Sequence, residues 1–306
     1  AGDAITTGNY NVGLGNNAIG AVTTGSNNVG LGVQALFNTT GSGNVAVGTT
    51  AMNANTSASN NTAVGNNALA ANTTGASNVA VGSNALDANT TGTGNVAIGT
   101  NAATSNTTAD NNTAVGLDAF GTNTTGHSNV AIGKVALYGN TTGDLNTAAG
   151  YAALSGNSTA DNNTAFGGYA LQVNTTGTRN AAFGVEALDA NTTGSDNTAL
   201  GGYALTAATT AAYNTAVGRS ALAATTTGAS NTGLGYLALT ANTTGDRNTA
   251  VGSGAADSLT TGAANTALGY KAMDVHTTGN SNTAVGAYAL DANTTAGDNT
   301  AVGSSS

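Results

Sequence analysis

One pattern of apolar and polar positions repeats along the whole chain. In residues 61–77 (Asn-Thr-Ala-Val-Gly-Asn-Asn-Ala-Leu-Ala-Ala-Asn-Thr-Thr-Gly-Ala-Ser), two short apolar stretches are separated by stretches rich in Asn, Thr and Gly. The Gly that closes the first apolar stretch recurs every 17 residues, with a single interval of 16. So strict a period indicates a stack of equal coils, in which each repeat contacts only its neighbours.

We number the positions of the repeat as columns 1 to 17, starting from the Asn of the Asn-Thr-Ala-Val-Gly segment, and call each repeat a rung. Columns 2 and 4 carry Thr or Val and larger apolar residues, whereas columns 1, 3 and 5 carry Asn, Ala or Gly, and Gly. This alternation predicts a strand over columns 1–5. Columns 8 and 9, mostly Ala-Leu, predict a second short strand, and columns 6–7 and 14–17 have turn residues.

The pattern therefore predicts an all-β fold, a parallel β-solenoid of about 18 rungs of 17 residues with two short strands in each rung. A helical alternative is disfavoured because Val, Thr, Asn and Gly dominate the repeat. No stretch departs from the repeat for long enough to form a linker, so we expect one continuous domain over residues 1–306. Both ends fall within a repeat, and we expect a segment of a longer fibre or a filament subunit.

Four columns hardly vary between rungs. Column 1 is Asn and column 5 is Gly in every copy, column 8 is Ala in every complete copy, and column 13 is Thr except for Ser158. We interpret the Asn as a ladder of side-chain amides, and the Gly as a position of positive φ or close backbone contact. The Ala suits a place where two backbones nearly touch, and the Thr predicts a rank of hydroxyl or methyl groups. The predicted ladder residues are Asn61, Asn78, Asn95, Asn112, Asn129, Gly65, Gly82, Gly99, Ala68, Ala85, Thr73 and Thr90.

Charged residues make up only 6% of the chain and avoid columns 1–5 entirely. They lie in columns 6, 7, 10, 16 and 17, which also hold all nine Tyr. Because neither face of the strand over columns 1–5 accepts a charge, we expect both faces to be covered, although one solenoid covers only one. Another copy of the same chain then covers the second face, in a trimer or another lateral assembly.

Composition and motifs exclude several classes of function. The net charge of −9 disfavours nucleic acid and anionic membranes as partners, and no apolar run is long enough to span a bilayer. Without Cys there is no disulfide framework and no thiolate metal site. Catalytic triads and phosphate-binding Gly loops are also missing. We therefore expect no cofactor, no metal and no enzymatic activity.

Residues 78–83 (Asn-Val-Ala-Val-Gly-Ser), 95–100 (Asn-Val-Ala-Ile-Gly-Thr) and 129–134 (Asn-Val-Ala-Ile-Gly-Lys) resemble the Ser-Val-Ala-Ile-Gly motif of YadA-like heads in trimeric autotransporter adhesins. The repeat here is longer, and Asn replaces the Ser. The resemblance implies a left-handed parallel β-roll, with three chains side by side, that binds host matrix proteins or surfaces. The repeat also resembles those of bacterial and phage tail-fibre-like proteins.

The leading hypothesis is thus a structural or adhesive extracellular fibre at a cell surface, or in a phage virion, whose partners are its own copies and a host surface, environmental surface or glycan. One alternative is a glycan-binding or glycan-cleaving shaft, for which Asp257, Asp274 and Asp291 on successive rungs of column 10 form the best acidic cluster. His127 and His276 make no site together. Ice binding is the other alternative, prompted by Thr-Thr pairs such as residues 73–74.

Two further features of the sequence concern local conformation. Asn-Xaa-Thr/Ser glycan acceptors recur, mostly in column 12, and we interpret them as turn residues rather than glycosylation sites. The single 16-residue rung contains Leu36-Phe37-Asn38, which places Asn38 in column 12 and the missing residue just before it.

Overall fold

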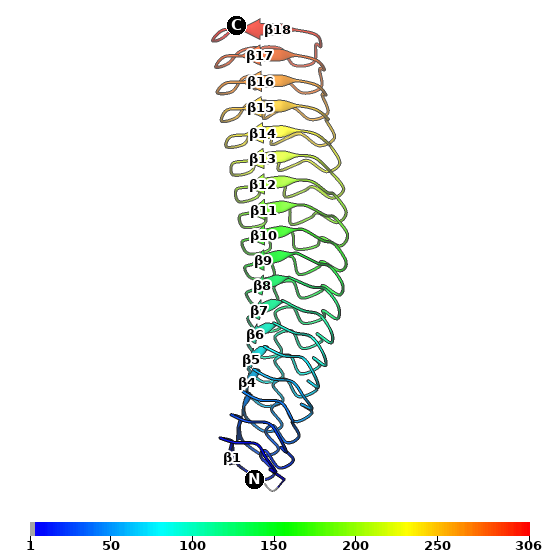
Figure 1. Cartoon of the computed structure of the whole chain (residues 1–306). Helices are drawn as coiled ribbons and strands as arrows, with labels where there is room; N and C mark the ends of the chain where they lie inside the picture. Colours follow the sequence, from blue (N-terminus) through cyan, green and yellow to red (C-terminus); the bar gives the residue numbers. More distant parts are fainter. Residues whose placement is uncertain (1–3) are drawn as a thin grey trace. The chain divides into compact units, whose positions relative to one another are not determined.

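The computed structural model describes residues 4–306 and divides the chain into unit 1 (Ala1–Ala152) and unit 2 (Ala153–Ser306). Each unit is a coil of rungs with one strand in every rung (Figure 1). The strands of unit 1 are β1 (Val12–Leu14), β2 (Val29–Leu31), β3 (Val45–Val47), β4 (Thr62–Val64), β5 (Val79–Val81), β6 (Val96–Ile98), β7 (Thr113–Val115), β8 (Val130–Ile132) and β9 (Thr147–Ala149). Those of unit 2 are β10 (Thr164–Phe166), β11 (Ala181–Phe183), β12 (Thr198–Leu200), β13 (Thr215–Val217), β14 (Thr232–Leu234), β15 (Thr249–Val251), β16 (Thr266–Leu268), β17 (Thr283–Val285) and β18 (Thr300–Val302).

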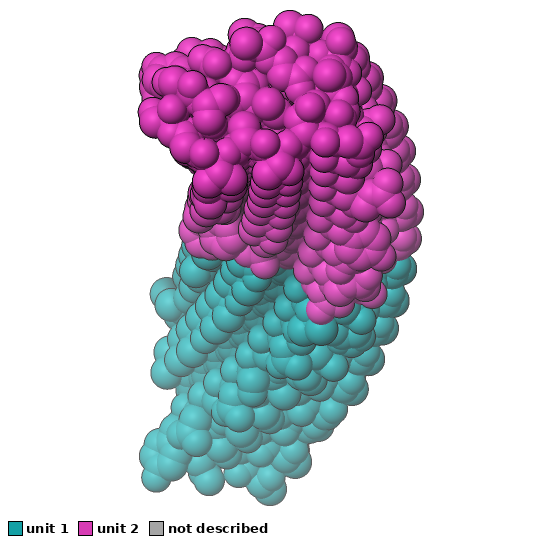
Figure 2. All heavy atoms as spheres, turned by 90° about the horizontal axis from the view of Figure 1, so that it is seen from above, with its two compact units in different colours: residues 1–152 teal, residues 153–306 magenta. Residues whose placement is uncertain are grey.

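Within each unit, consecutive strands pair in parallel and in register. Val64 pairs with Val81 in unit 1, and Leu200 pairs with Val217 in unit 2. Each column therefore faces the same column of the next rung, and the side chains of a column stack in ridges that are visible in both units (Figure 2). The predicted all-β parallel β-solenoid with 17-residue rungs is confirmed.

The prediction of two strands per rung was wrong. The strand covers columns 2–4 only, and columns 8 and 9, the predicted second strand, lie in a turn. Asn67 in column 7 and Leu69 in column 9 have φ values of 57° and 52°, which belong to the left-handed region and not to the extended region of a strand. The Ala-Leu pair indicates burial, but burial alone does not fix backbone conformation.

Hydrogen bonds between rungs continue outside the strand. The backbone N–H of Leu69 donates to the carbonyl of Ala85 at 3.0 Å, and that of Thr73 donates to the carbonyl of Thr90 at 2.9 Å. These turn columns thus pair with the next rung much as a strand does. This pairing satisfies backbone groups that would otherwise be buried without partners, and it compensates for the short strands.

The interior of a rung is filled by columns 1, 3, 8, 9, 12 and 15. The buried residues of one rung are Asn61, Ala63, Ala68, Leu69, Asn72 and Gly75. The coil is thin, because the strand lies close to the turn opposite it. In column 3, a Cβ atom on Gly233 would lie 3.3 Å from the side chain of Leu222 in the rung before it, so this column has room for little more than a methyl group.

The 16-residue rung lacks column 14, not the residue before column 12. Thr39 is buried and accepts the side-chain N–H of Asn55 in column 12 of the next rung at 3.0 Å, whereas Asn38 is exposed. The hydroxyl of Thr40 donates to the carbonyl of Thr56, which places Thr40 in column 13. The prediction that Asn38 occupies column 12 was wrong. Either Asn38 or Thr39 fits the column 12 pattern, and only the structure shows which side chain points inward.

Candidate functional site

Column 1 forms a ladder of buried Asn side chains. The Oδ1 atom of Asn61 accepts the backbone N–H of Asn78 at 2.8 Å, and Nδ2 of Asn78 donates to the carbonyl of Gly92 in the same rung at 2.8 Å. The same two bonds recur at Asn95, Asn112 and Asn129. Direct contact between amides is longer, 3.3 Å for Asn129 and Asn112. The Asn side chain therefore closes its own rung and joins it to the next.

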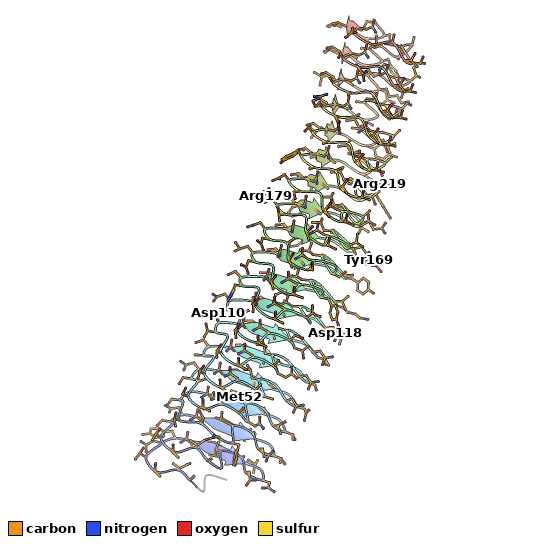
Figure 3. The ribbon with its side chains drawn as sticks, turned by 90° about the vertical axis from the view of Figure 1, so that its right-hand side faces the viewer. Met52, Asp110, Asp118, Tyr169, Arg179 and Arg219 are labelled. Atoms are coloured by element: carbon orange, nitrogen blue, oxygen red, sulfur yellow. The ribbon has the colours of Figure 1, made fainter. Side chains whose placement is uncertain are left out.

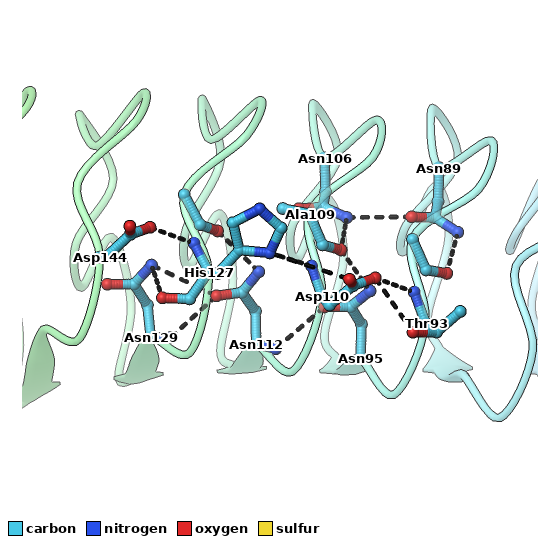
Figure 4. A network of polar contacts seen from close by, with 12 residues as sticks. Asn89, Thr93, Asn95, Asn106, Ala109, Asp110, Asn112, His127, Asn129 and Asp144 are labelled. Atoms are coloured by element: carbon cyan, nitrogen blue, oxygen red, sulfur yellow. Dashed lines mark hydrogen bonds and ion pairs between the residues drawn. The ribbon is translucent and has the colours of Figure 1, made fainter.

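A second ladder of buried Asn occupies column 12 and was missed in the sequence. Nδ2 of Asn106 donates to Oδ1 of Asn89 at 3.0 Å and to the carbonyl of Ala109 at 3.1 Å (Figure 4). Asn89 and Asn106 are fully buried, so in the folded rung these Asn-Xaa-Thr amides are not available to carry a glycan. The sequence did contain a signal that this column is buried. Val22 and other apolar residues replace Asn there, and an exposed turn position does not favour Val.

His276 takes the place of Asn in column 12 of unit 2. Its Nε2 lies 3.0 Å from the carbonyl of Gly279, the position that an Asn amide would occupy, and its Nδ1 lies 3.0 Å from the carbonyl of Asn293. The ring is fully buried. His276 therefore fills a ladder position instead of presenting a catalytic nitrogen to solvent.

The column 5 Gly residues have both properties that were expected of them. Gly65, Gly82 and Gly99 have φ values of 140°, 138° and 137°, which side chains rarely adopt. A Cβ atom on any of them would also overlap the carbonyl oxygen of the column 5 Gly in the next rung. Ala68 and Ala85 in column 8 are fully buried, so column 8 leaves its side chain no access to solvent.

Column 13 is a rank of hydroxyl groups. The Oγ1 atom of Thr73 donates to the carbonyl of Thr90 at 3.0 Å, and that of Thr90 donates to the next rung in the same way. Ser158, the one substitution in this column, donates its hydroxyl to the carbonyl of Thr175 at 3.1 Å. The hydroxyl is thus the shared requirement, and the methyl group is not.

The acids and the His of column 16 in unit 1 cap backbone groups. The backbone N–H of Thr93 donates to Asp110 at 2.7 Å, that of Asp110 donates to Nδ1 of His127 at 2.9 Å, and that of His127 donates to Asp144 at 2.6 Å (Figure 4). Each side chain serves the rung before it. His127 therefore accepts at Nδ1 and has no nucleophile beside it in this network.

Column 10 brings Asp257 and Asp274 together in unit 2. Burial raises the pKa of Asp257, and hydrogen bonding to Asp274 together with the negative charge of Asp274 raises it further. Lys271 lies 3.2 Å from Asp274 and offsets part of this repulsion. Asp291 occupies the same column one rung further on, but it is not among the groups that perturb Asp257. Elsewhere in the column, Asp189 accepts the hydroxyl of Thr206 at 2.8 Å.

The edge formed by columns 16 and 17 carries an exposed ion pair in unit 2. Arg179 donates two parallel hydrogen bonds to Asp196, at 2.7 and 2.8 Å, and the hydrogen bond from the guanidinium lowers the pKa of Asp196. Tyr169 and Arg219, in columns 7 and 6, lie on the opposite edge of the unit (Figure 3). Unit 1 has the same arrangement, with Asp110 and Asp118 on opposite edges (Figure 3).

The outer face of the strand is formed by columns 2 and 4, and column 4 is apolar and partly or fully exposed to solvent in both units. In column 4, Ile98 and Ile132 of unit 1 are 42% and 45% exposed, and Leu200 of unit 2 is 49% exposed. Phe166 and Phe183 stack on this face with ring centroids 5.9 Å apart. The inner face is filled by column 3, so the solenoid covers one face of its strand and leaves the other open.

The edge formed by columns 6 and 7 differs between the units. In unit 1 the column 7 amides bond to one another: Asn67 donates to Asn84 at 3.1 Å, Asn84 to Asn101 at 3.2 Å, and Asn101 to Asp118 at 2.9 Å. In unit 2 the same columns hold five partly exposed Tyr, at positions 169, 203, 236, 270 and 288, whereas unit 1 holds one, Tyr151 in column 6. The ring of Tyr270 meets that of Tyr288 edge to face at 5.3 Å.

Residues 4–306 contain no cluster of three or more His, Asp or Glu that could hold a metal ion. No helix that could cross a bilayer occurs among the same residues. A scan against models of protein families and a search of curated proteins found no match.

Proposed function

We propose that the chain is a structural and adhesive part of an extracellular fibre, in which copies associate side by side through the outer face of the strand. The observation that supports this most directly is the exposed apolar column 4, which accepts no charge in any rung. Exposed apolar area of this kind is typical of interaction surfaces. The ladders of columns 1, 5, 8, 12 and 13 form the scaffold, and columns 6, 7, 10, 16 and 17 present the variable side chains.

The hydrogen bonds and the low charge of the chain also support a structural role at an extracellular site. The side chains that accept backbone N–H groups in column 16, such as Asp110, serve the fold. The net charge of −9 disfavours nucleic acid as a partner. A fibre with few charges and repeated inter-rung bonds suits an extracellular site, at a cell surface or on a virion, and its resemblance to adhesin and tail-fibre repeats leads to the same proposal.

Sedimentation equilibrium of the purified chain tests the lateral association. Leu200→Lys combined with Leu234→Lys places two charges on the outer face without touching the interior, and we expect the oligomer to dissociate. The control combines Ser220→Lys with Ser253→Lys, in columns 7 and 6, which accept Lys271 and Lys134 naturally. A wild-type monomer at micromolar concentration, or equal dissociation of both variants, would refute the proposed lateral interface.

Ice binding remains a second candidate because eight of the nine strands of unit 2 place Thr in column 2, beside the apolar column 4. The Thr rank on the outer face is thus column 2, and not the Thr-Thr pairs of columns 13 and 14, whose first hydroxyl is bonded to backbone. The unequal sizes of Phe166, Leu200 and Val217 in column 4 make this face uneven. We therefore expect no thermal hysteresis in the wild-type protein; clear hysteresis that is lost in Thr215→Lys would favour ice binding.

A further inference from the structure

One edge of unit 2 carries a row of tyrosines that the fibre scaffold does not require. We call Tyr169, Tyr203, Tyr236, Tyr270 and Tyr288 the tyrosine row; all lie in column 6 or 7, and each is between 37% and 49% exposed. Tyr169 and Arg219 project from this edge, away from the ladders (Figure 3). Partly exposed Tyr that recur along one edge, with an apolar ring and a hydrated hydroxyl, are typical of a binding surface.

The row has a regular spacing set by the rungs. Tyr169, Tyr203, Tyr236 and Tyr270 occupy alternate rungs, so neighbouring rings are about 9.6 Å apart along the stack for a strand spacing of about 4.8 Å. This distance is close to the length of two sugar units in an extended β-linked chain.

The charges around the row favour an uncharged ligand. Arg219 and Glu186, which have opposite signs, occupy the same two columns in rungs between the tyrosines, and Lys271 is paired with Asp274. A nucleic acid or an acidic polymer would require a continuous basic surface, which this edge lacks. Aromatic rings offer apolar faces together with phenol groups that hydrogen-bond, and these two properties match the C–H faces and hydroxyl groups of sugars.

The corresponding edge of unit 1 carries a ladder of amides over several rungs. There the column 7 side chains Asn67, Asn84, Asn101 and Asp118 bond to one another in a chain, which occupies their donors and acceptors. In unit 2, Tyr169, Tyr203 and Tyr288 lie in column 7, and Tyr236 and Tyr270 lie beside it in column 6, where unit 1 has only Tyr151. Some of these rings contact each other, as Tyr270 and Tyr288 do, and their exposed parts offer a surface for stacking.

We propose that the tyrosine row binds an extended, uncharged β-linked polysaccharide, with Tyr rings stacked on alternate sugar units. The inference deepens the adhesive part of the proposed function by giving it a ligand class, and it does not depend on lateral association of copies. A chain that is monomeric in solution can still bind through this edge. The two proposals can therefore fail separately.

The test measures binding of the full chain to cellohexaose and chitohexaose by titration calorimetry, and its retention on microcrystalline cellulose and on chitin. The variant is Tyr203→Ala with Tyr236→Ala, at the centre of the row. The control is Tyr213→Ala, which removes a ring that is 64% exposed in column 17, on the opposite edge. We expect wild type and control to bind alike, and the double variant to lose about threefold to tenfold in affinity for each ring removed.

Three results would overturn the proposal. The first is absence of binding by the wild-type chain to either hexaose and either polymer. The second is an equal loss in the Tyr213→Ala control, which would indicate that no particular edge is involved. The third is dissociation of an oligomer by Tyr203→Ala with Tyr236→Ala in sedimentation experiments, since a second copy would then cover the row. Circular dichroism of each variant checks that the rungs remain folded.

Discussion

A Cβ atom on Gly167 would lie 2.5 Å from the carbonyl oxygen of Gly184, the same column in the next rung. Gly167 also has a φ of 132°. We therefore expect Gly167→Ala to destabilise unit 2 by about 2–5 kcal/mol, through backbone strain and the displacement of the neighbouring rung. Gly168→Ala is the matched control, because its new methyl group meets no atom within 4 Å. Thermal unfolding of the two variants checks the difference, and equal midpoints would contradict it.

The column 1 ladder predicts a large loss from a substitution that keeps side-chain volume. Asn78→Leu removes the acceptor of the buried Asn95 N–H and the donor to the Gly92 carbonyl. Each buried group left without a partner costs about 1–3 kcal/mol, and we expect the midpoint of urea unfolding to fall accordingly. Asn66→Leu, at an exposed position in column 6, is the control and should leave the midpoint almost unchanged. A small effect at Asn78 would mean that water replaces the amide.

The fold was predictable because period and residue type agree at the columns that define it. An Asn or Gly that recurs in every rung must make the same contact with each neighbouring rung, as Asn61 and Gly65 do. The second strand was not predictable, because the left-handed φ of Leu69 comes from the packing of the turn and not from the preference of Leu. The column 12 ladder was hidden for a related reason, since Asn is common both in turns and in buried amide ladders.

The candidate surfaces were also only partly predictable from the sequence. The absence of charge from columns 1–5 predicted that a single solenoid would leave one face of the strand open, and column 4 is exposed, as at Ile98 and Leu200. The Tyr of columns 6 and 7 were visible in the sequence. Their regular spacing along the stack became clear only from the register of neighbouring rungs. Contacts such as that of Asp257 with Asp274 depend on side-chain conformation, which the repeat does not determine.

Asp257 gives the chain a stability that depends on pH. Its pKa is raised in the folded state by burial and by Asp274, so the folded chain holds this proton more tightly than the unfolded chain does. This contribution to stability is present below the unfolded pKa, about 4, and is lost as pH rises through the folded pKa. We expect Asp257→Asn to raise the thermal midpoint at pH 7 and to have little effect at pH 3. Asp291→Asn, in the same column, is the control, and a pH-independent gain for Asp257→Asn would contradict the assignment.

Column 12 offers a stabilising substitution. Asn191 donates to Asn174 at 2.8 Å, but its own buried Oδ1 has no partner, because Ala208 interrupts the ladder in the next rung. The hydroxyl of Thr225, one rung further on, is also buried without a partner. In Ala208→Asn, the new Nδ2 would donate to Asn191, and the new Oδ1 would accept from Thr225.

The backbone of this rung matches rungs that already hold Asn in column 12, so we expect the new side chain to fit. Satisfying two buried polar atoms should raise the free energy of unfolding by about 1–3 kcal/mol. Ala207→Asn, in the half-buried neighbouring column, adds the same group outside the ladder and should give no gain. Urea unfolding of both variants measures the effect. A loss of stability in Ala208→Asn that Ala207→Asn does not share would show that the interruption relieves crowding in the core instead of leaving a gap in the ladder.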